Sequence, residues 1–171
     1  MEATKIGDPW SIIPVKNSRY AKDCTDVYLS KKNIEDLTNF ESFPNIEALW
    51  INDNLIKTLN PLEHNFRIKR INAENNLITD IEILKNFKFL NVALLSNNLL
   101  QDLEKQLSIL SKLSFLEQLD LFGNPVSKEQ CYRLRIIGRM PQLKILDRHG
   151  IIISNYLTRK ASIRKINEKM V

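Results

Sequence analysis

The chain has 171 residues, 43% of them hydrophobic and 26% charged, a composition typical of one compact soluble domain and not of a disordered or membrane protein. No apolar run approaches the roughly 18 to 20 residues that cross a bilayer, and the first residues lack the basic and apolar regions of a secretory signal. The formal charge of +5 belongs to the segment from Arg148 onward, which holds six basic residues and one acidic residue, so residues 1–147 are neutral overall.

Residues 1–23 precede the first repeated motif, and we predict that they form an N-terminal extension or cap. A stack of repeats exposes apolar surface at each end unless another segment covers it. The stretch from Pro9 to Asp23 could provide that cover. Its candidate covering side chains are Trp10, Ile12 and Ile13.

One motif, L-x-x-L-x-L-x-x-N-x-L, occurs five times between residues 24 and 126. Its asparagine position is occupied in turn by Lys32, Asn54, Asn76, Asn98 and Asn124. The first three steps between these positions are 22 residues long and the last is 26. This period predicts an α/β solenoid, a short right-handed arc in which every repeat adds one strand to a parallel concave sheet.

The asparagine position has a physical role, because the chain bends inward there and buries backbone N–H and C=O groups that have no strand partner. An asparagine side chain can both donate to and accept from such groups. We therefore expect the four asparagines to stack as a ladder. Lys32 in the first repeat suggests an end position, where water can serve the backbone.

The return half of each repeat carries a second apolar column, which we expect to fill the convex side of the core. Its members are Leu37, Leu59, Ile81 and Leu103, followed by Phe40, Leu62 and Leu84. The fourth repeat holds four extra residues around Asp102 to Leu110. Leucines recur there at helical spacing, which predicts a convex helix.

Side chains along a strand alternate between the core and the open face, so the outward positions should form three columns across the five strands. The columns are Asp26, Ala48, Arg70, Val92, Gln118; Tyr28, Trp50, Asn72, Leu94, Asp120; and Ser30, Asn52, Glu74, Ser96, Phe122. Four large apolar side chains face solvent in this arrangement, although the core does not need them. Because Trp and Tyr are enriched at interface anchors, we predict that a helix or an extended segment of another protein binds here. The predicted contact residues are Tyr28, Trp50, Arg70, Asn72, Glu74, Leu94 and Phe122. Alternatively, the exposed aromatics are ordinary surface residues, or a terminal segment folds over them.

Residues 127–148 are predicted to close the other end of the stack. Ser127 and Gln130 have the spacing of a capping box, which predicts a helix from there through Met140, stopped by Pro141. The apolar residues that would then return across the last coil are Leu143, Ile145 and Leu146.

Residues 149–171 are predicted to form a basic amphipathic tail. The apolar residues that fall near one helical stripe are Ile152, Tyr156, Ile163, Ile166 and Met170. The tail could extend the cap, or it could dock on an acidic surface such as a tubulin lattice or another protein; membrane or RNA contact is a third use. The docking residues would be Arg159, Lys160, Arg164 and Lys165, and Ser162 resembles a basophilic kinase site.

The sequence offers no chemistry-bearing arrangement. It has no glycine-rich phosphate loop and no histidine-centred nucleophile, so we expect neither catalysis nor a cofactor nor a small-molecule substrate. Cys24, Cys131, His64 and His149 are far apart in sequence, and Asp53 is a loop carboxylate beside a ladder asparagine, so no metal site is expected. Unclustered cysteines and the lack of an Asn-X-Ser/Thr sequon favour a reducing, cytoplasmic compartment.

The repeats and the closing segment "NPVSKEQCYRLRIIGRMPQLKILDR" resemble intracellular leucine-rich-repeat proteins with a Y-R-L…P-x-L…L-D cap. That class includes the spliceosomal A-prime protein, a phosphatase-1 regulator and ciliary axonemal proteins. The segments "VYLSKKNIEDL", "LWINDN" and "YRLRIIGRMPQLKILDR" are most similar to the axonemal members. The resemblance implies a non-catalytic scaffold that binds axonemal or tubulin-associated proteins in the cilium or flagellum. The alternative that it implies is a nuclear, A-prime-like subunit that holds an RNA-binding protein, without direct nucleic-acid binding by this chain.

Overall fold

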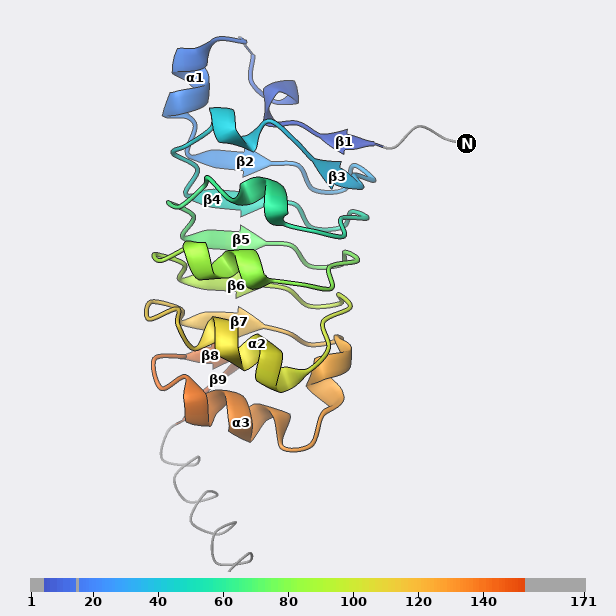
Figure 1. Ribbon diagram of the computed structural model, residues 1–171, viewed down its shortest axis with the longest axis vertical. Helices are drawn as coiled ribbons and strands as arrows, with labels where there is room; N and C mark the ends of the chain where they lie inside the picture. Colours follow the sequence, from blue (N-terminus) through green and yellow to red (C-terminus); the bar gives the residue numbers. More distant parts are fainter. Residues whose placement is uncertain (1–4, 15, 153–171) are drawn as a thin grey trace, which may run out of the picture.

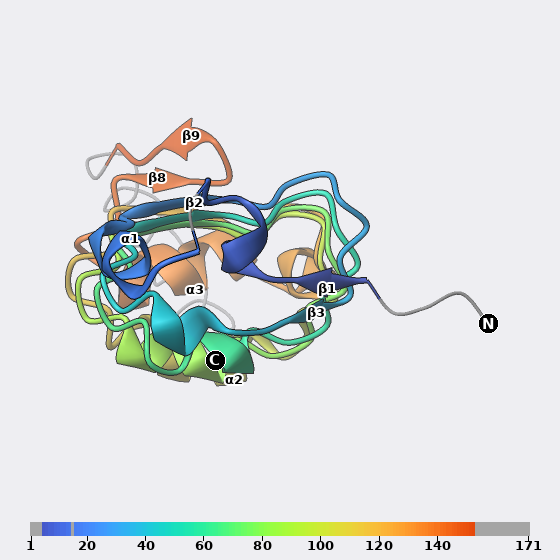
Figure 2. The same cartoon turned by 90° about the horizontal axis from the view of Figure 1, so that it is seen from above.

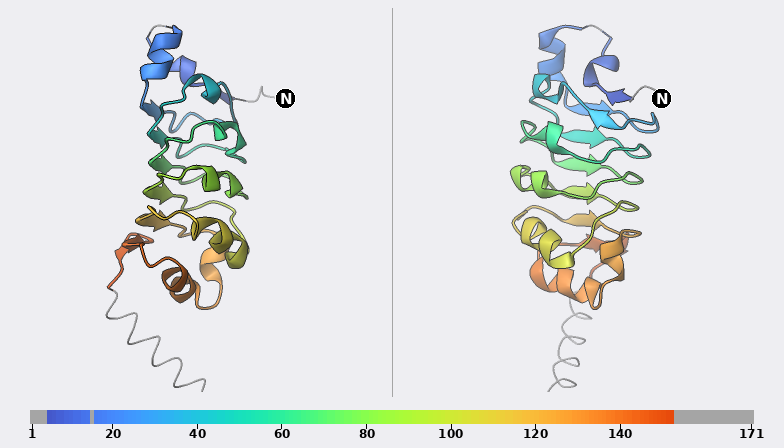
Figure 3. Two further views of the ribbon diagram at one scale, coloured as in Figure 1. Left: turned by 60° about the vertical axis from the view of Figure 1, so that its left-hand side comes forward. Right: turned by 45° about the vertical axis from the view of Figure 1, so that its right-hand side comes forward.

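The computed structural model describes residues 5–14 and 16–152, which form an elongated stack of coils (Figure 1). Every coil contributes one short strand to the same side of the stack, and the return segments lie on the opposite side (Figures 2 and 3). The parallel-sheet solenoid expected from the 22-residue period is confirmed.

A seven-stranded sheet runs along the stack in the order β2-β4-β5-β6-β7-β8-β9. The strands contributed by the five repeats are β2 (Asp26–Tyr28), β4 (Ala48–Trp50), β5 (Arg70–Asn72), β6 (Val92–Leu94) and β7 (Gln118–Asp120). They pair in parallel, with Leu49 opposite Ile71 and Ile71 opposite Ala93. The register therefore keeps equivalent repeat positions side by side, as the motif requires.

The core lies between the sheet and the convex return segments. Leu49, Ile51, Ile71 and Leu119 point inward from the strands and are completely buried. The return column is buried as well. Its members from Leu37 to Leu103 and from Phe40 to Leu84 are at most 6% exposed. No coil could bury both faces alone, so the coils form one continuous core.

The asparagine ladder has the expected geometry. The Asn76 Nδ2 donates to the carbonyls of Ile51 and Ala73, at 3.0 and 3.1 Å, and its Oδ1 accepts from the Ile56 amide at 3.0 Å. Equivalent bonds are made by Asn54, Asn98 and Asn124. Each asparagine thus links its own coil to the preceding one through buried backbone groups.

The residue before each ladder position has a positive φ, which the sequence analysis did not anticipate. These residues are Lys31, Asp53, Asn75, Asn97 and Gly123, with φ between 54° and 76°. On the surface of this column Asn97 Nδ2 donates to Asn75 Oδ1 at 2.8 Å, and Asn75 Nδ2 donates to Asp53 Oδ1 at 2.6 Å. Gly123 adopts this φ without strain, and a Cβ at residue 123 would displace the exposed Asn97 side chain, whose Oδ1 lies close to it.

The convex side is built from short helices. They are the 3₁₀ helices η2 (Phe40–Ser42), η3 (Asn60–Leu62) and η4 (Glu82–Asn86), followed by the α-helix α2 (Leu103–Leu110). Helix α2 confirms the helix predicted for the longer fourth repeat, and its Asp102 cap accepts a hydrogen bond from the Lys105 amide. The four extra residues leave the sheet register intact, because Val92 still pairs with Gln118.

At the N-terminal end, β1 (Ile6–Gly7) pairs in parallel with β3 (Asp36–Leu37), and η1 (Pro9–Ser11) and α1 (Ser18–Asp23) follow. The Trp10 ring meets Phe43 edge-on, with ring centroids 5.1 Å apart. Ile12 and Ile13 are partly buried against the same core.

The C-terminal cap differs from the prediction at its start. The chain first forms η5 (Pro125–Lys128), and α3 (Tyr132–Arg139) begins only after Cys131, which has a φ of 56°. The Ser127–Gln130 capping box does not form, because Ser127 lies within η5 and no α-helix begins there; its hydroxyl donates to the Asn124 carbonyl at 2.8 Å. Pro125 directly follows the ladder asparagine and starts a 3₁₀ turn there, so the helix is delayed.

After α3 the chain returns as β8 (Ile145–Leu146), parallel to β7, and turns back as β9 (His149–Gly150), antiparallel to β8. The boundary predicted between cap and tail, after Arg148, therefore falls inside a β-hairpin. The tail residues Arg159, Lys160, Ser162, Arg164 and Lys165 lie outside the described residues. Among the helices within residues 5–14 and 16–152, none is long and apolar enough to span a membrane.

Candidate protein-binding face

The outward side chains of the sheet form the columns that the repeat predicts. Strand pairing places Tyr28 beside Trp50, Trp50 beside Asn72, and Asn72 beside Leu94. The neighbouring column runs from Ser30, whose hydroxyl donates to Asn52 Oδ1 at 2.6 Å, through Glu74 and Ser96. On the concave face, each outward side chain therefore lies beside the side chain at the equivalent position of the neighbouring strand.

The N-terminal half of this face is aromatic. The rings of Tyr28 and Trp50 stack with centroids 4.2 Å apart and planes inclined by 10°. Tyr28 is 55% exposed, and Trp50 is half-buried. The adjacent column contains two charged residues near this pair. They are Asp26 and Arg70, and both are exposed. The stack is a rigid apolar platform with charged groups beside it.

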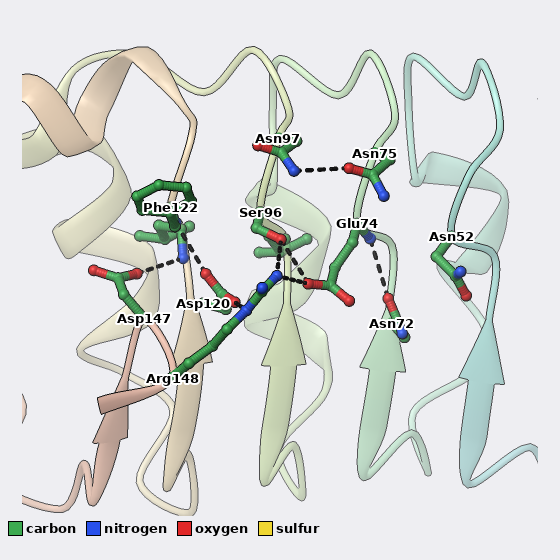
Figure 4. Close-up of polar contacts among 12 residues, drawn as sticks. Asn52, Asn72, Glu74, Asn75, Ser96, Asn97, Asp120, Phe122, Asp147 and Arg148 are labelled. Carbon is green, nitrogen blue, oxygen red and sulfur yellow. Dashed lines mark hydrogen bonds and ion pairs between the residues drawn. The ribbon is translucent and has the colours of Figure 1, made fainter. Parts of the chain in front are cut away.

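The C-terminal half is polar, and one arginine dominates it (Figure 4). The Arg148 Nε donates to Asp120 Oδ2 at 2.9 Å, and its Nη2 donates to Glu74 Oε1 at 2.9 Å. The Ser96 hydroxyl also donates to Glu74 Oε1, at 2.6 Å. Arg148 thus crosses three strands, and Glu74, a predicted partner contact, already has an intramolecular partner.

The β8–β9 turn holds Arg148 in this position. Asp147 and Arg148 both have positive φ, 50° and 65°, and the hairpin rises over the sheet at its C-terminal end (Figure 2). The Asp147 Oδ1 accepts from the Leu121 amide at 2.9 Å and from the Tyr132 hydroxyl at 3.2 Å. Burial raises the pKa of Asp147 and that of Tyr132. The cap helix α3, the last repeat and the turn are therefore tied together at one carboxyl group.

Asp120 connects this turn to the sheet. Its side chain is only 1% exposed, and its Oδ1 accepts from the Phe122 amide at 3.0 Å while its Oδ2 receives Arg148. The side chain of Arg148 is itself 66% exposed. A buried carboxylate needs such partners, because an unpaired charge in this position would be costly.

The predicted contact residues do not all share one environment. Tyr28 and Phe122 are well exposed, at 55% and 61%, whereas Trp50 and Leu94 are half-buried. The prediction that all four apolar side chains face solvent is therefore wrong for the middle pair, of which Trp50 is partly covered by its stacking on Tyr28. Asn72 uses its Oδ1 to accept from the Glu74 amide at 3.2 Å.

Arg148, Ser96 and Asp120 belong to the face, but sequence reasoning did not identify them as functional. Arg148 was counted with the basic tail, and the Glu74 it contacts lies 74 residues earlier. Only the pairing of β8 with β7 brings the turn above the sheet. No local pattern in the sequence predicts that contact.

The chemistry of this face is that of a binding surface. Within the described ranges, no group of three or more His, Cys, Asp or Glu residues is placed to hold a metal ion. Glu74 and Asp120 both form ion pairs with the single Arg148, and His64 and His149 are exposed. The face therefore offers shape, apolar area and charge, which are the means of recognising another molecule.

Comparison with known proteins gives matches over the same region. A family model described as "Leucine-rich repeat" matches residues 51–164. The U2 small nuclear ribonucleoprotein A′ of Mycosarcoma maydis is 36% identical over 103 residues, which cover 59% of this chain and 42% of that protein. Leucine-rich repeat-containing protein 51 of Bos taurus is 30% identical over 114 residues, covering 61% of this chain and 59% of that protein.

Among solved structures, a chain of the Drosophila melanogaster SNF/U2A′ complex superimposes with a TM-score of 0.70 at 25% identity, covering 85% of this chain and 87% of that one. Internalin C2 of Listeria monocytogenes, at 24% identity and a TM-score of 0.63, shows the same fold. The chain spans about 42% and 59% of the length of the two curated relatives named above.

Proposed function

Because this chain belongs to the leucine-rich-repeat family, we propose that it is a non-catalytic scaffold that holds another protein against its concave sheet. The observation that carries the proposal is the stacked pair of Tyr28 and Trp50, an aromatic platform on the concave sheet in which Tyr28 is 55% exposed and Trp50 is half-buried. Aromatic side chains that are already ordered lose little entropy on binding, so they are effective anchors.

The shape of the face fits a helix or an extended segment. The platform lies at the N-terminal end, Arg70 is exposed on the next strand, and the Arg148 network borders the surface beyond it. A partner with an apolar anchor over Trp50 and an acidic group near Arg70 would match these features. Leu94 and Phe122 would extend the contact toward the C-terminal end.

The direct test needs the partner, which proximity labelling and crosslinking in native cells would name. Binding of that purified neighbour would then be measured for the native chain and for Tyr28→Ala and Trp50→Ala. Tyr20→Ala is the matched control, because Tyr20 is 51% exposed on α1, away from the concave face. Unchanged binding by folded Tyr28→Ala and Trp50→Ala variants would refute the concave-face proposal.

The cellular setting has two candidates. The similarity to A′ proteins and to the fly SNF/U2A′ complex supports a nuclear ribonucleoprotein role, in which the chain holds an RNA-binding protein. The ciliary role rests on the resemblance of the segments quoted above to axonemal proteins. Nuclear fractionation with RNA co-purification would support the first setting, and axonemal fractionation would support the second.

The basic tail is proposed as a second docking element on the strength of its sequence. Removal of residues 155–171 separates its two uses. Loss of folding would show that the tail extends the cap, whereas lost binding with retained folding would show that Arg159, Lys160, Arg164 and Lys165 dock. Phosphate on Ser162, sought by mass spectrometry of native protein, would lower the local positive charge and weaken docking.

A further inference from the structure

A second surface lies on the edge of the solenoid where the chain leads into the strands. We name the three loops at residues 63–67, 85–89 and 111–115 the lead-in loops; they precede β5, β6 and β7. Each carries one exposed phenylalanine. They are Phe66 at 53%, Phe89 at 56% and Phe115 at 58% exposure. Three consecutive coils thus present a phenyl ring on the same edge, which the core does not require.

The three rings are not evenly packed. Phe89 and Phe115 stack with centroids 6.3 Å apart. Between Phe66 and Phe89 there is instead a hollow of about 350 Å³, lined by these two rings together with Lys85, Asn86 and Lys88. A hollow with a phenyl ring on either side can accept one large apolar side chain.

The charge around this hollow is positive. The lead-in loops contain four basic residues, Arg67, Lys85, Lys88 and Lys112, and one acidic residue, Glu63. Lys85 is paired with Glu82 at 2.6 Å, and Glu63 lies 3.4 Å from His64. Over the described part of the chain, Arg67, Lys88 and Lys112 form no ion pair. Free cations beside exposed aromatic rings complement an acidic partner.

We infer that the lead-in loops bind an acidic peptide segment of another protein, whose one large apolar side chain enters the hollow between Phe66 and Phe89 while its carboxylates face Arg67 and Lys88. A peptide fits better than a nucleic acid. Residues 1–147 are neutral overall, and the lead-in loops contribute three cations that form no ion pair within the described residues, few for binding along a phosphate backbone. This surface lies where the strands begin and not on the concave face, so it can bind a peptide while the concave face holds a different partner.

The test begins by panning a phage-displayed library of random dodecapeptides on the full chain. Enriched peptides should contain a Phe, Leu or Trp flanked by Asp or Glu residues. A labelled synthetic copy of the enriched peptide should bind about tenfold more weakly to Phe89→Ser, and its affinity should fall severalfold for Lys88→Glu and at raised salt.

The control variants separate this surface from the others. Leu99→Ser removes an apolar side chain of similar exposure, 44%, from the coil that carries Phe89 but at the opposite, strand-exit edge, and it should bind the peptide normally. Trp50→Ala should also bind normally, so failure of the concave-face proposal would not affect this result. Because Phe89 is exposed, Phe89→Ser should unfold at the same urea concentration as the native chain. If it unfolds earlier, the peptide affinity of Lys88→Glu tests the site instead.

Three outcomes would overturn the inference. Enriched peptides without acidic residues would refute the charge complementarity. Equal binding to Phe89→Ser or to Lys88→Glu by the folded variants would refute the site. Binding of a single-stranded uridine dodecamer that Phe89→Ser abolishes would show that the edge is a nucleic-acid surface instead.

Discussion

The two halves of the concave face share one backbone register but differ in what covers them. At the N-terminal half, Tyr28 and Trp50 are stacked, Tyr28 is 55% exposed, and no ion pair between described residues lies over them. At the C-terminal half, Asp120 is buried beneath Arg148, which also reaches Glu74 (Figure 4). The repeat therefore determines where a side chain points, whereas the end cap determines whether it is available to a partner.

The largest effect is expected for a change in the asparagine ladder, which supports both halves of the concave face. In Asn98→Ala, the Ala73 and Leu95 carbonyls and the Ile78 amide lose buried hydrogen bonds of 2.9 to 3.0 Å. The free energy of unfolding in urea should fall by roughly 3 to 5 kcal/mol. Asn97→Gly, which keeps the positive φ and removes an exposed bond to Asn75, should cost about 1 kcal/mol or less. Similar losses for the two variants would contradict the ladder's role.

The next effect concerns partner binding, which should depend more on the aromatic half of the concave face than on the polar half. Trp50→Ala should weaken binding of the concave-face partner by roughly 30- to 100-fold, since it removes the larger ring of the platform. Phe122→Ala, beside the polar half, should weaken it by less than about fivefold. Calorimetric titration of the partner into each variant measures both. A larger loss for Phe122→Ala would reverse the assignment of the two halves.

A smaller effect is expected when the Arg148 side chain is removed from the polar half of the concave face. Arg148→Ala should lower stability, because it leaves the buried Asp120 carboxylate without its ion-pair partner; the exposure of the Arg148 side chain, 66%, reduces the effect through solvent screening. The cost should shrink in high salt, which unfolding in urea at two ionic strengths would show. Lys144→Ala, which breaks the exposed pair with Glu117, is the control and should cost less. A loss for Arg148→Ala that is no larger than the loss for Lys144→Ala would contradict this expectation.

The smallest effect concerns the turn that carries Arg148. Burial raises the pKa of Asp147, so the folded chain favours its protonated form. That contribution is fully present below the unfolded pKa, about 3.9, and is lost as the pH rises through the folded pKa. In Asp147→Asn the amide oxygen can keep both hydrogen bonds without the charge. The native chain should therefore gain stability relative to Asp147→Asn as the pH falls through the acidic range, which unfolding in urea at several pH values would measure. A gain on raising the pH would contradict this sign.

The repeat made much of this fold predictable. The step of 22 residues located the strands, the ladder asparagines and the buried return column, because each of these depends on local alternation and on a period. The helix α2 was predictable for the same reason, since Leu103, Leu107 and Leu110 have helical spacing.

The missed features depend on contacts between distant segments or on backbone conformation. Ser127 has the sequence spacing of a capping box, but the chain forms a 3₁₀ turn after Asn124. Within that turn the Ser127 hydroxyl donates to the Asn124 carbonyl, and no capping box forms. The positive φ at Lys31 and Asp53 leaves no clear mark on sequence, because neither residue is glycine. The reach of Arg148 to Glu74 depends on the β8–β9 hairpin, which is set by the cap.

The position of α2 has a consequence for how this molecule can change in length. The fourth coil gained four residues on its convex side, yet Val92 and Gln118 still pair across the sheet. Growth by insertion is thus absorbed on the outer arc, whereas a single residue added within a strand would exchange its inward and outward side chains. A fluorescent or affinity tag placed at the exposed Gln101, before α2 and outside the lead-in loops, could therefore be carried by the folded chain without disturbing either recognition surface.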